Sequence, residues 1–407
     1  MPRIQGITIR RYRALVDVTL GRTFEQRGPD PLTDVVAVIG PNGSGKSTLM
    51  DALGFLGDCL RFGVEEASDQ PHRGGFDRLR TKGETGPIEF EIYYRQEPKA
   101  RPISYSLAIN ADRAGRLSVV REKLRQGRAG QKVGKPFHFL DLTDGSGWAW
   151  AGETATEAEP AKKQPVALED PRKLGIVTLG NLAEHPRIVA FREFLEGWYL
   201  SYFVPDLARA LPMAGAQKHL DREGRNLANY LQHMERERKD RLRSVLQRVT
   251  HRIPGVRNIR VEKSKDGRLL IQFNDQGYKD PFYAQDMSDG TLKLFAYLLL
   301  LEDPEPAPLI GIEEPENGLH HQLLATLADE MLKTAESSGG PQIFVTTHSP
   351  YFVDALRPEQ VWILEKDKRG AATAARAADQ PGVMELVGEG LPLGNLWYSD
   401  HFGRGNP

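Results

Sequence analysis

A glycine-rich turn directly after an apolar run constrains this chain more than any other feature. Residues 35–39 read Val-Val-Ala-Val-Ile, and residues 40–47 read Gly-Pro-Asn-Gly-Ser-Gly-Lys-Ser. The apolar run predicts a buried strand, and the residues from Lys46 to about Phe62 predict a helix. Glycines let backbone N–H groups turn toward phosphate oxygens, a helix N-terminus attracts negative charge, and a lysine adds a mobile positive charge. The sequence therefore predicts a triphosphate-binding loop; a chance glycine-rich turn is the alternative.

Individual roles within this loop follow from the chemistry of its side chains. Lys46 is expected to contact the terminal phosphates and to take part in catalysis, and the Ser47 hydroxyl is expected to bind a metal ion. The expected cofactors are a nucleoside triphosphate and Mg²⁺. The predicted nucleotide-binding residues of the loop are Gly40, Pro41, Asn42, Gly43, Ser44, Gly45, Lys46, Ser47 and Thr48.

The bulk composition is that of an ordinary globular protein. The chain has 407 residues, of which 40% are hydrophobic, and a formal net charge of −1. Any binding to nucleic acid or anionic lipid must therefore come from local patches. No apolar run reaches membrane-spanning length, so we expect no membrane association and a cytoplasmic location. The single cysteine, Cys59, lies in an apolar stretch and is interpreted as a core residue.

Hydrophobic patterns outline the rest of the chain. Residues 88–94 and 105–109 alternate apolar and polar side chains, which predicts an antiparallel meander. Residues 145–170 are rich in Ala, Glu, Lys, Pro and Gly without periodicity, which predicts a mobile loop. Amphipathic helices are predicted over 188–200 and 226–251, and we assign both to an inserted lid.

Two adjacent acids end a second apolar run. Residues 308–315 read Pro-Leu-Ile-Gly-Ile-Glu-Glu-Pro. Hydrolysis of a triphosphate needs one carboxylate near the metal's hydration shell and another that orients and deprotonates the attacking water. We assign Glu313 to the metal and Glu314 to the water. The alternative, that the two acids only begin a loop, is weakened by the phosphate loop upstream.

Two further segments carry residues suited to phosphate. Residues 287–291 read Met-Ser-Asp-Gly-Thr and precede an apolar helix, so Ser288 and Gly290, with Asp289 between them, are predicted to form an anion site at its N-terminus. Taken alone, the segment would be only a helix N-cap. Residues 342–349 predict a strand that ends in His348, whose distance from the two acids suits a catalytic sensor of the terminal phosphate. The segment 316–320, Glu-Asn-Gly-Leu-His, follows the second acid.

The order of these motifs resembles ABC-type ATPases of the RecF, SMC and OLD group, and also the stand-alone ATPases of bacterial genome-defence operons. The match covers about residues 2–94 and 264–362. The resemblance implies an α/β P-loop NTPase of ABC type, with a mixed sheet core, antiparallel N-terminal strands and an inserted helical lid. The expected parts are 1–144, the N-terminal half of the ATPase domain; 145–255, a linker and the lid; and 256–407, the C-terminal half with a short tail.

The resemblance also implies how the motifs act. Two subunits close head to tail on ATP as a homodimer, and each nucleotide lies between one phosphate loop and the partner's Ser288–Gly290 signature. His348 would be the switch histidine, and Asn317 and Gly318 would lie at the dimer seam.

The sequence departs from the group's pattern at several positions. Glu313 stands where most relatives carry aspartate, which lengthens the metal arm by one methylene. The glutamine loop is uncertain between Gln70 and Gln96. Arg11 and Arg13 near the first strand are expected either to contact the nucleotide or to be solvated.

Two main functions remain open from the sequence. The leading hypothesis is an ATP-driven switch that controls a separately encoded effector in genome defence. The alternative is a RecF-like repair clamp that binds DNA directly, and a transporter subunit is a weak third.

Two basic clusters could contact DNA. The first lies on the second predicted lid helix and comprises Arg236, Arg238, Lys239, Arg241, Arg243, Arg248 and Arg252. The second lies in an expected hairpin loop and comprises Arg121, Lys123, Arg125, Arg128, Lys132 and Lys135.

Nuclease activity is not expected in this chain. A two-metal nuclease site needs several clustered acids, whereas Glu365 and Asp367 stand at a predicted strand end without the further acids that such a site requires. The expected reaction is ATP hydrolysis to ADP and phosphate.

Overall fold

The computed structural model describes residues 1–26, 28–127, 136–152, 163–215, 217–253 and 255–403. The chain divides into two compact units, each described here by itself. The first unit comprises Met1–Trp198, Pro358–Met384 and the residues from Phe402 on. The second comprises Tyr199–Arg357 and Glu385–His401.

The first unit is built mainly from strands. Its elements are β1 (Arg3–Tyr12), β2 (Leu15–Gly21), β3 (Val35–Ile39), α1 (Lys46–Phe62), α2 (Val64–Ser68), α3 (Phe76–Leu79), β4 (Ile88–Arg95), β5 (Ile103–Ala111), β6 (Leu117–Gln126), β7 (Phe137–Thr143), β8 (Ser146–Trp150), β9 (Lys163–Ala167), α4 (Gly175–Leu179), α5 (Pro186–Glu196), β16 (Val361–Lys366) and β17 (Ala372–Arg376). Eight strands form one antiparallel sheet in the order β2-β1-β4-β5-β6-β7-β8-β9. Separately, β3 pairs in parallel with β16, and β16 pairs antiparallel with β17.

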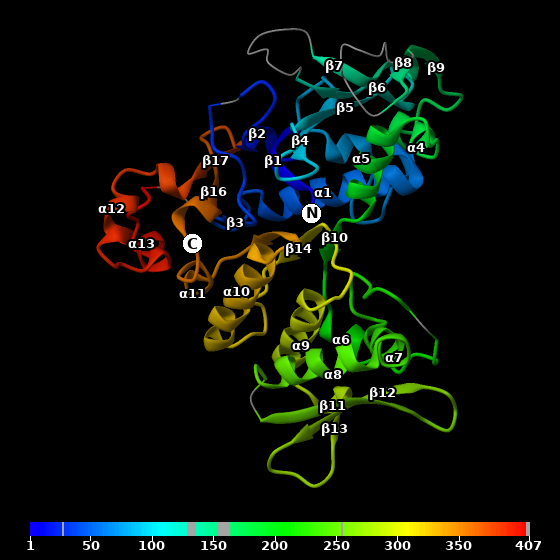
Figure 1. The fold of residues 1–407 in the computed structure, drawn as a ribbon. Coiled ribbons are helices and arrows are strands. Elements are labelled where there is room, and N and C mark those ends of the chain that lie inside the picture. The colour runs from blue at the N-terminus through cyan, green and yellow to red at the C-terminus, as the bar shows by residue number, and fades with distance from the viewer. Residues whose placement is uncertain (27, 128–135, 153–162, 216, 254, 404–407) are drawn as a thin grey trace. The chain divides into compact units, whose positions relative to one another are not determined.

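Helices α1 and α5 lie against the antiparallel sheet (Figure 1). Aromatic side chains hold them there. Phe55 of α1 lies 5.7 Å from the ring of Tyr12 on β1 and 5.9 Å from that of Phe90 on β4. Phe191 of α5 lies 4.8 Å from Tyr94, at the other end of the same strand. Such ring pairs add to the free energy gained from burying their area. Cys59 is buried in this layer, which confirms its interpretation as a core residue.

The second unit surrounds a short parallel sheet and a separate antiparallel one. Its elements are β10 (Tyr199–Ser201), α6 (Pro205–Ala208), α7 (Leu227–Glu237), α8 (Lys239–Thr250), β11 (Val256–Lys263), β12 (Leu269–Asp275), β13 (Phe282–Tyr283), α9 (Asp289–Leu301), β14 (Leu309–Glu313), α10 (His321–Glu336), β15 (Gln342–Thr346), α11 (Pro350–Val353) and α13 (Leu393–Tyr398). α12 (Val383–Gly388) begins in the first unit and ends in the second. β10, β14 and β15 pair in parallel, and β11, β12 and β13 form the antiparallel sheet.

Three helices of the second unit pack near its antiparallel sheet (Figure 1). α7 contacts both β11 and β12, and α8 contacts β11. Phe295 of α9 meets Phe273 of β12 edge to face at 5.4 Å between ring centroids. The predicted meander and the apolar strand before the glycine-rich turn are present as β4, β5 and β3.

Three sequence-based expectations about elements are wrong. The stretch 145–170 was expected to be a mobile loop, but it contains β8 and β9, which extend the antiparallel sheet through backbone hydrogen bonds that need no apolar periodicity. Residues 153–162 of that stretch lie outside the described residues. The helix predicted over 188–200 is present as α5. It was expected to belong to an inserted lid, but it packs on that sheet through Phe191. The helix predicted over 226–251 is two helices, because Arg238 leaves helical geometry at φ −145° and ψ 49°.

Candidate ATP site

The glycine-rich turn lies in the first unit, between β3 and α1. All five residues of β3 are fully buried, so the strand fixes where the turn begins. Gly40 has φ +140°, and a Cβ built on it would lie 1.9 Å from the carbonyl oxygen of Leu364 on neighbouring β16. Gly43 and Gly45 also have positive φ, +75° and +114°. Only glycine adopts this sequence of conformations without strain, so the turn is specified by backbone geometry.

Lys46 and Ser44 show how the turn is organised. Lys46 is 4% exposed, and its Nζ donates hydrogen bonds to the carbonyl oxygens of Gly40 at 2.8 Å and Pro41 at 3.1 Å. The Ser44 hydroxyl is buried and has no hydrogen-bond partner among the described residues. An unpartnered buried hydroxyl loses free energy unless it contacts another polar group.

The start of α1 completes a site that fits a triphosphate. Among the described residues, no side chain caps the N–H groups of the first turn, which begins at Lys46 after Gly45. Ser47 is exposed there, Thr48 is half-buried, and Pro41 and Asn42 lie on the outer side of the turn, half-buried and exposed. Free N–H groups, a buried hydroxyl and an ammonium group are the donors that phosphate oxygens accept. The residues present therefore fit the predicted phosphate loop.

Lys366 is a basic residue near the turn that the sequence did not single out. It ends β16, and its Nζ lies 4.0 Å from a Cβ built on Gly43. The proximity follows from the parallel pairing of β3 with β16, in which Ile39 is opposite Ile363. Because these strands lie far apart in the sequence, only the pairing reveals the contact.

Two of the three predicted catalytic residues, Glu314 and His348, meet in the second unit. Their strands, β14 and β15, are parallel neighbours, with Glu313 in register with Thr346. Both side chains therefore emerge at the carboxyl ends of adjacent strands. The Glu314 carboxylate lies 3.4 Å from Nε2 of His348 and accepts a 2.9 Å hydrogen bond from the side-chain amide of Asn317.

The backbone fixes the position of Glu314 further. It has φ +40°, which is uncommon for a residue with a side chain, and its N–H donates to the carbonyl oxygen of Thr346 at 2.9 Å. A left-handed residue held by a neighbouring strand is typical of functional sites. Glu313 precedes it as the last residue of β14.

Glu316 is a functional candidate that sequence reasoning named only as part of a loop. Its carboxylate accepts hydrogen bonds from the Thr347 hydroxyl at 2.9 Å and from the His348 backbone N–H at 2.5 Å. Burial raises the pKa of Glu316 above its usual value, while these hydrogen bonds oppose the shift. Glu316 therefore anchors the segment that carries His348. In the sequence, the only indication of this role was that Glu316 is a third acid in the run Glu-Glu-Pro-Glu.

The Ser288–Gly290 signature begins α9 in the same unit. Ser288 is the N-cap residue, and its hydroxyl accepts from the N–H of Thr291 at 3.2 Å. Asp289 forms an ion pair with Arg209. Gly290 approaches the next loop so closely that a Cβ built on it would lie 2.4 Å from the carbonyl oxygen of Gly318.

Lys293 joins the signature helix to the loop beside Glu314. Its side chain is 7% exposed, and Nζ donates to the carbonyl oxygen of Asn317 at 2.8 Å. Burial lowers the pKa of Lys293, and the nearby acids Glu316 and Glu314 oppose that shift. A continuous chain of contacts therefore runs from α9 through Asn317 to Glu314 and His348.

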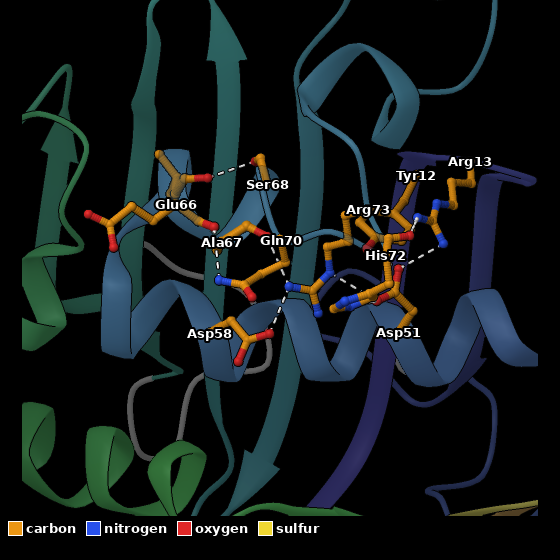
Figure 2. Close-up of polar contacts among 11 residues, drawn as sticks. Tyr12, Arg13, Asp51, Asp58, Glu66, Ala67, Ser68, Gln70, His72 and Arg73 are labelled. Carbon is orange, nitrogen blue, oxygen red and sulfur yellow. Dashed lines mark hydrogen bonds and ion pairs between the residues drawn. The ribbon is translucent and has the colours of Figure 1, made fainter. Parts of the chain in front are cut away.

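An ion-pair network beside α1 includes Arg13, one of the two arginines that were considered for nucleotide contact (Figure 2). Arg73 bridges Asp51 and Asp58 of α1 at 2.9 and 2.7 Å. Asp51 also lies 3.0 Å from Arg13 and accepts from the Tyr12 hydroxyl at 2.7 Å. The side chain of Arg13 therefore has a protein partner, Asp51, and is not simply solvated.

The remaining sequence candidates have protein partners in the first unit. Arg11 pairs with Glu89 at 2.6 Å. Of the two candidates for the glutamine loop, Gln96 accepts from Arg187 at 2.8 Å, whereas the Gln70 amide donates only to the nearby carbonyl of Glu66 at 3.3 Å (Figure 2). Gln70 is therefore the better candidate, and its role stays a prediction.

A family profile decides the identity of the chain. Residues 35–354 match the family described as "AAA domain, putative AbiEii toxin, Type IV TA system". The chain belongs to this family. It is an ATPase of the AAA/ABC type, and members of this class use ATP with Mg²⁺. No curated protein matches this AAA ATPase significantly.

Solved structures show the fold of this AAA ATPase. One is an SMC head bound to the C-winged helix domain of ScpA, with 15% identity and a TM-score of 0.53 over 91% of this chain and 97% of that one. Another is an SMC head with an extended coiled coil bound to the C-terminal domain of ScpA derived from Pyrococcus furiosus, with 15% identity and a TM-score of 0.52 over 96% and 99%. The predicted α/β P-loop fold of ABC type is therefore confirmed.

Several residues of the two basic clusters of the AAA ATPase pair with acids. On and beside α8, Arg248 lies 2.7 Å from Glu302, Arg252 lies 2.6 Å from Glu330, and Arg238 pairs with Glu305. These ion pairs offset part of the positive charge that the sequence indicated on this helix.

The second cluster was placed wrongly. Arg121, Lys123 and Arg125 lie on strand β6, not in a hairpin loop, and pair with Glu89, Asp141 and Glu25 at 3.0, 3.0 and 2.9 Å. Arg128, Lys132 and Lys135 lie outside the described residues. Among the residues that are described, no helix combines the length and apolar character needed to cross a bilayer.

Proposed function

We propose that this AAA ATPase is an ATP-driven conformational switch that dimerises on ATP and controls a separate effector protein in genome defence, acting in the cytoplasm. The observation that carries the proposal is the chain of contacts within the second unit. Lys293 ties the signature helix to Asn317, and Asn317 orients the carboxylate of Glu314 beside His348. A change at the signature is thereby coupled to the residue assigned to water activation.

Glu314 and His348 are proposed to act in hydrolysis. Glu314 takes the proton of the attacking water, and His348 senses the terminal phosphate. The phosphate loop binds the triphosphate through the Lys46 ammonium, the Ser44 hydroxyl and the N–H groups at the start of α1. Ser47 and Glu313 are proposed to hold Mg²⁺, which when bound neutralises phosphate charge.

Dimerisation is proposed because the signature lies at an exposed helix N-terminus, where the Ser288 hydroxyl can donate a hydrogen bond. Ser288 and Asp289 are exposed at the N-terminus of α9, whereas Gly290 is buried against the loop at Gly318. A signature of this kind can serve the nucleotide of a partner subunit. Sedimentation of the protein with and without ATP tests this step, and a monomer under both conditions contradicts it.

The catalytic claim is tested by Glu314→Gln. Loss of a general base lowers turnover by about 10²–10⁴-fold. ATP binding, measured with a fluorescent analogue, should be retained, since the phosphate loop is unchanged. Glu336→Gln on α10, an exposed acid paired with Arg357, is the matched control and should keep full turnover. Unchanged turnover in the Glu314 variant would remove the hydrolytic part of the proposal.

The chain is proposed to lack nuclease activity, so the effector is a separate protein. Asp367, one of the two acids considered, accepts hydrogen bonds from the backbone N–H groups of Arg369 and Ala371 at 2.8 and 2.9 Å. It therefore shapes the turn between β16 and β17. A neighbouring gene for a nuclease-like protein that copurifies with the ATPase supports this assignment.

A RecF-like clamp that binds DNA directly is the second candidate. The basic lid helix favours it, and the ion pairs of Arg238, Arg248 and Arg252 weaken it. Salt-dependent, ATP-dependent DNA binding that is lost on neutralising the lid arginines would favour the clamp over the switch.

A further inference from the structure

The groove between α8 and β11 has the geometry of a binding site for an extended peptide. It has a volume of about 470 Å³ and lies wholly within the second unit. Five consecutive residues of β11, from Arg257 to Val261, line it. Consecutive residues point to opposite faces of a strand, so the groove meets the edge of β11 and not one of its faces.

The edge of β11 offers hydrogen-bonding groups to such a peptide. β11 is the outer strand in the order β11-β12-β13. Among the described residues, β11 pairs with β12 along one edge, and no strand pairs with its other edge. An edge strand presents a row of backbone N–H and C=O groups that an added strand can pair with. Five residues of strand correspond to about 16 Å of length, enough for a peptide of five or six residues.

One face of α8 forms the opposite wall. Its lining residues recur at helical spacing and include Leu242, Leu246 and Thr250. Leu242 is 7% exposed, and Ile259 of β11 is 1% exposed, so the floor between helix and strand is apolar. A strand added to β11 would direct every second side chain onto this floor.

The rim of the groove is basic. Four cationic side chains line it, against one acid, Glu235. The cations are Lys239, Arg243, Arg257 and Arg260. Arg243 has an acid nearby, Asp240 at 3.7 Å, but that side chain is 98% exposed and neutralises little. The rim therefore complements negative charge.

We propose that this groove binds an extended segment of a partner protein, in which apolar residues alternate with acidic ones, as an added strand on β11. The apolar residues face α8 and the acidic residues meet the basic rim. This inference depends on the proposed function at one point, which is that the partner protein is the effector. The alternation of apolar and acidic residues is then the feature by which the ATPase recognises the effector.

The test uses the full-length protein and a fluorescein-labelled peptide, acetyl-Glu-Val-Glu-Leu-Glu-Val-Glu-amide, in a fluorescence-polarisation titration. Saturable binding that weakens as salt rises is the expected result. The same peptide with lysine in place of every glutamate should not bind. Two further peptides carry N-methyl groups on alternate backbone nitrogens, one on the odd and one on the even positions. One of them should fail to bind, because every second N–H group of an added strand donates to the edge of β11.

Charge reversal locates the site. Arg257→Glu combined with Arg260→Glu should weaken binding at least about tenfold. Arg241→Glu, an exposed arginine of α8 that does not line the groove, is the matched control and should leave affinity unchanged. If the double variant melts earlier than the parent, the methylated peptides on the parent protein carry the test instead.

Three results would overturn the proposal: no saturable binding at millimolar peptide, equal binding of the lysine peptide, or tighter binding of a single-stranded oligonucleotide that the double variant loses. ATP turnover is measured on the same samples. Peptide binding with no turnover defeats only the proposed hydrolysis, whereas turnover without peptide binding defeats only this inference.

Discussion

The ammonium of Lys293 lies 2.8 Å from the backbone carbonyl oxygen of Asn317, so a buried lysine of the signature helix holds the loop beside the proposed catalytic acid. Asn317 in turn donates its side-chain amide to Glu314. Because Lys293 is 7% exposed, no water replaces it readily if it is removed. The relation makes Lys293 a positioning residue for Glu314.

Lys293→Met keeps most of the side chain, which becomes one atom shorter, and removes its donor. We expect turnover to fall more than tenfold while the affinity for a fluorescent ATP analogue stays within twofold, because the phosphate loop is untouched. Removing this part-buried, charge-assisted hydrogen bond should also lower the free energy of unfolding by about 1.5–3 kcal/mol. Lys333→Met, on the exposed part of α10, is the control. Equal loss of turnover and of ATP affinity would argue for a general structural role.

A buried acid in the first unit gives a dependence of stability on pH. Glu122 of β6 accepts hydrogen bonds from the Tyr105 hydroxyl at 2.9 Å and from the N–H groups of Gly175 and Ile176 at 2.5 and 3.1 Å. Burial nevertheless raises the pKa of Glu122 to about 7, from an ordinary value of 4.5. The folded state therefore binds more protons than the unfolded state between these two values.

The sign of the effect follows from that difference. The stabilisation is present below the unfolded pKa and is lost as pH rises through the folded pKa, so the contribution of Glu122 to stability falls between about pH 4.5 and 7. The upper limit is about 3 kcal/mol. Urea titrations at several pH values measure it. Glu122→Gln should be less stable, because its amide N–H₂ faces backbone donors, and should lose this pH slope; Glu25→Gln, an exposed acid, should keep it. A slope that survives in the Glu122 variant would assign it to another group.

The network at Arg73 predicts a large loss of stability (Figure 2). Its side chain is 2% exposed and neutralises Asp51 and Asp58, which are 11% and 10% exposed. Arg73→Met leaves two buried carboxylates without their shared cation, which should lower the free energy of unfolding by about 3–5 kcal/mol. Arg116→Met, an exposed arginine paired with Asp112, should change it by less than about 1 kcal/mol. Chemical denaturation at neutral pH compares the two, and similar midpoints would contradict the role of the network.

The motifs were predictable from the sequence because their chemistry is local. The turn from Gly40 to Ser47 and the pair Glu313 and Glu314 each follow an apolar run, so residue types and spacing were enough to place them after strands β3 and β14. The pairing of β14 with β15 then explains why Glu314 and His348 meet. That step required the sheet, which no local pattern encodes.

The errors share a physical cause, namely long-range packing. β8 and β9 have weak periodicity, and they are strands because β8 pairs with β7 and β9 pairs with β8. The break at Arg238 is invisible in the apolar spacing, which continues across it from Met234 to Leu242. Lys366, Glu316 and Lys293 matter through partners distant in the sequence, so only the folded chain reveals them.

Gly40 provides the sharpest test of the phosphate loop. A Cβ at this position would overlap the carbonyl oxygen of Leu364 at 1.9 Å, and the φ of +140° is itself strained for any other residue. Gly40→Ala should therefore displace the turn from β16 and abolish binding of a fluorescent ATP analogue. Gly370→Ala in the turn between β16 and β17 is the matched control, because Gly370 has φ +82° but open space around it. It should cost about 1 kcal/mol of strain and keep nucleotide binding, so loss of binding in both variants would show that overlap at Leu364 is not the deciding factor.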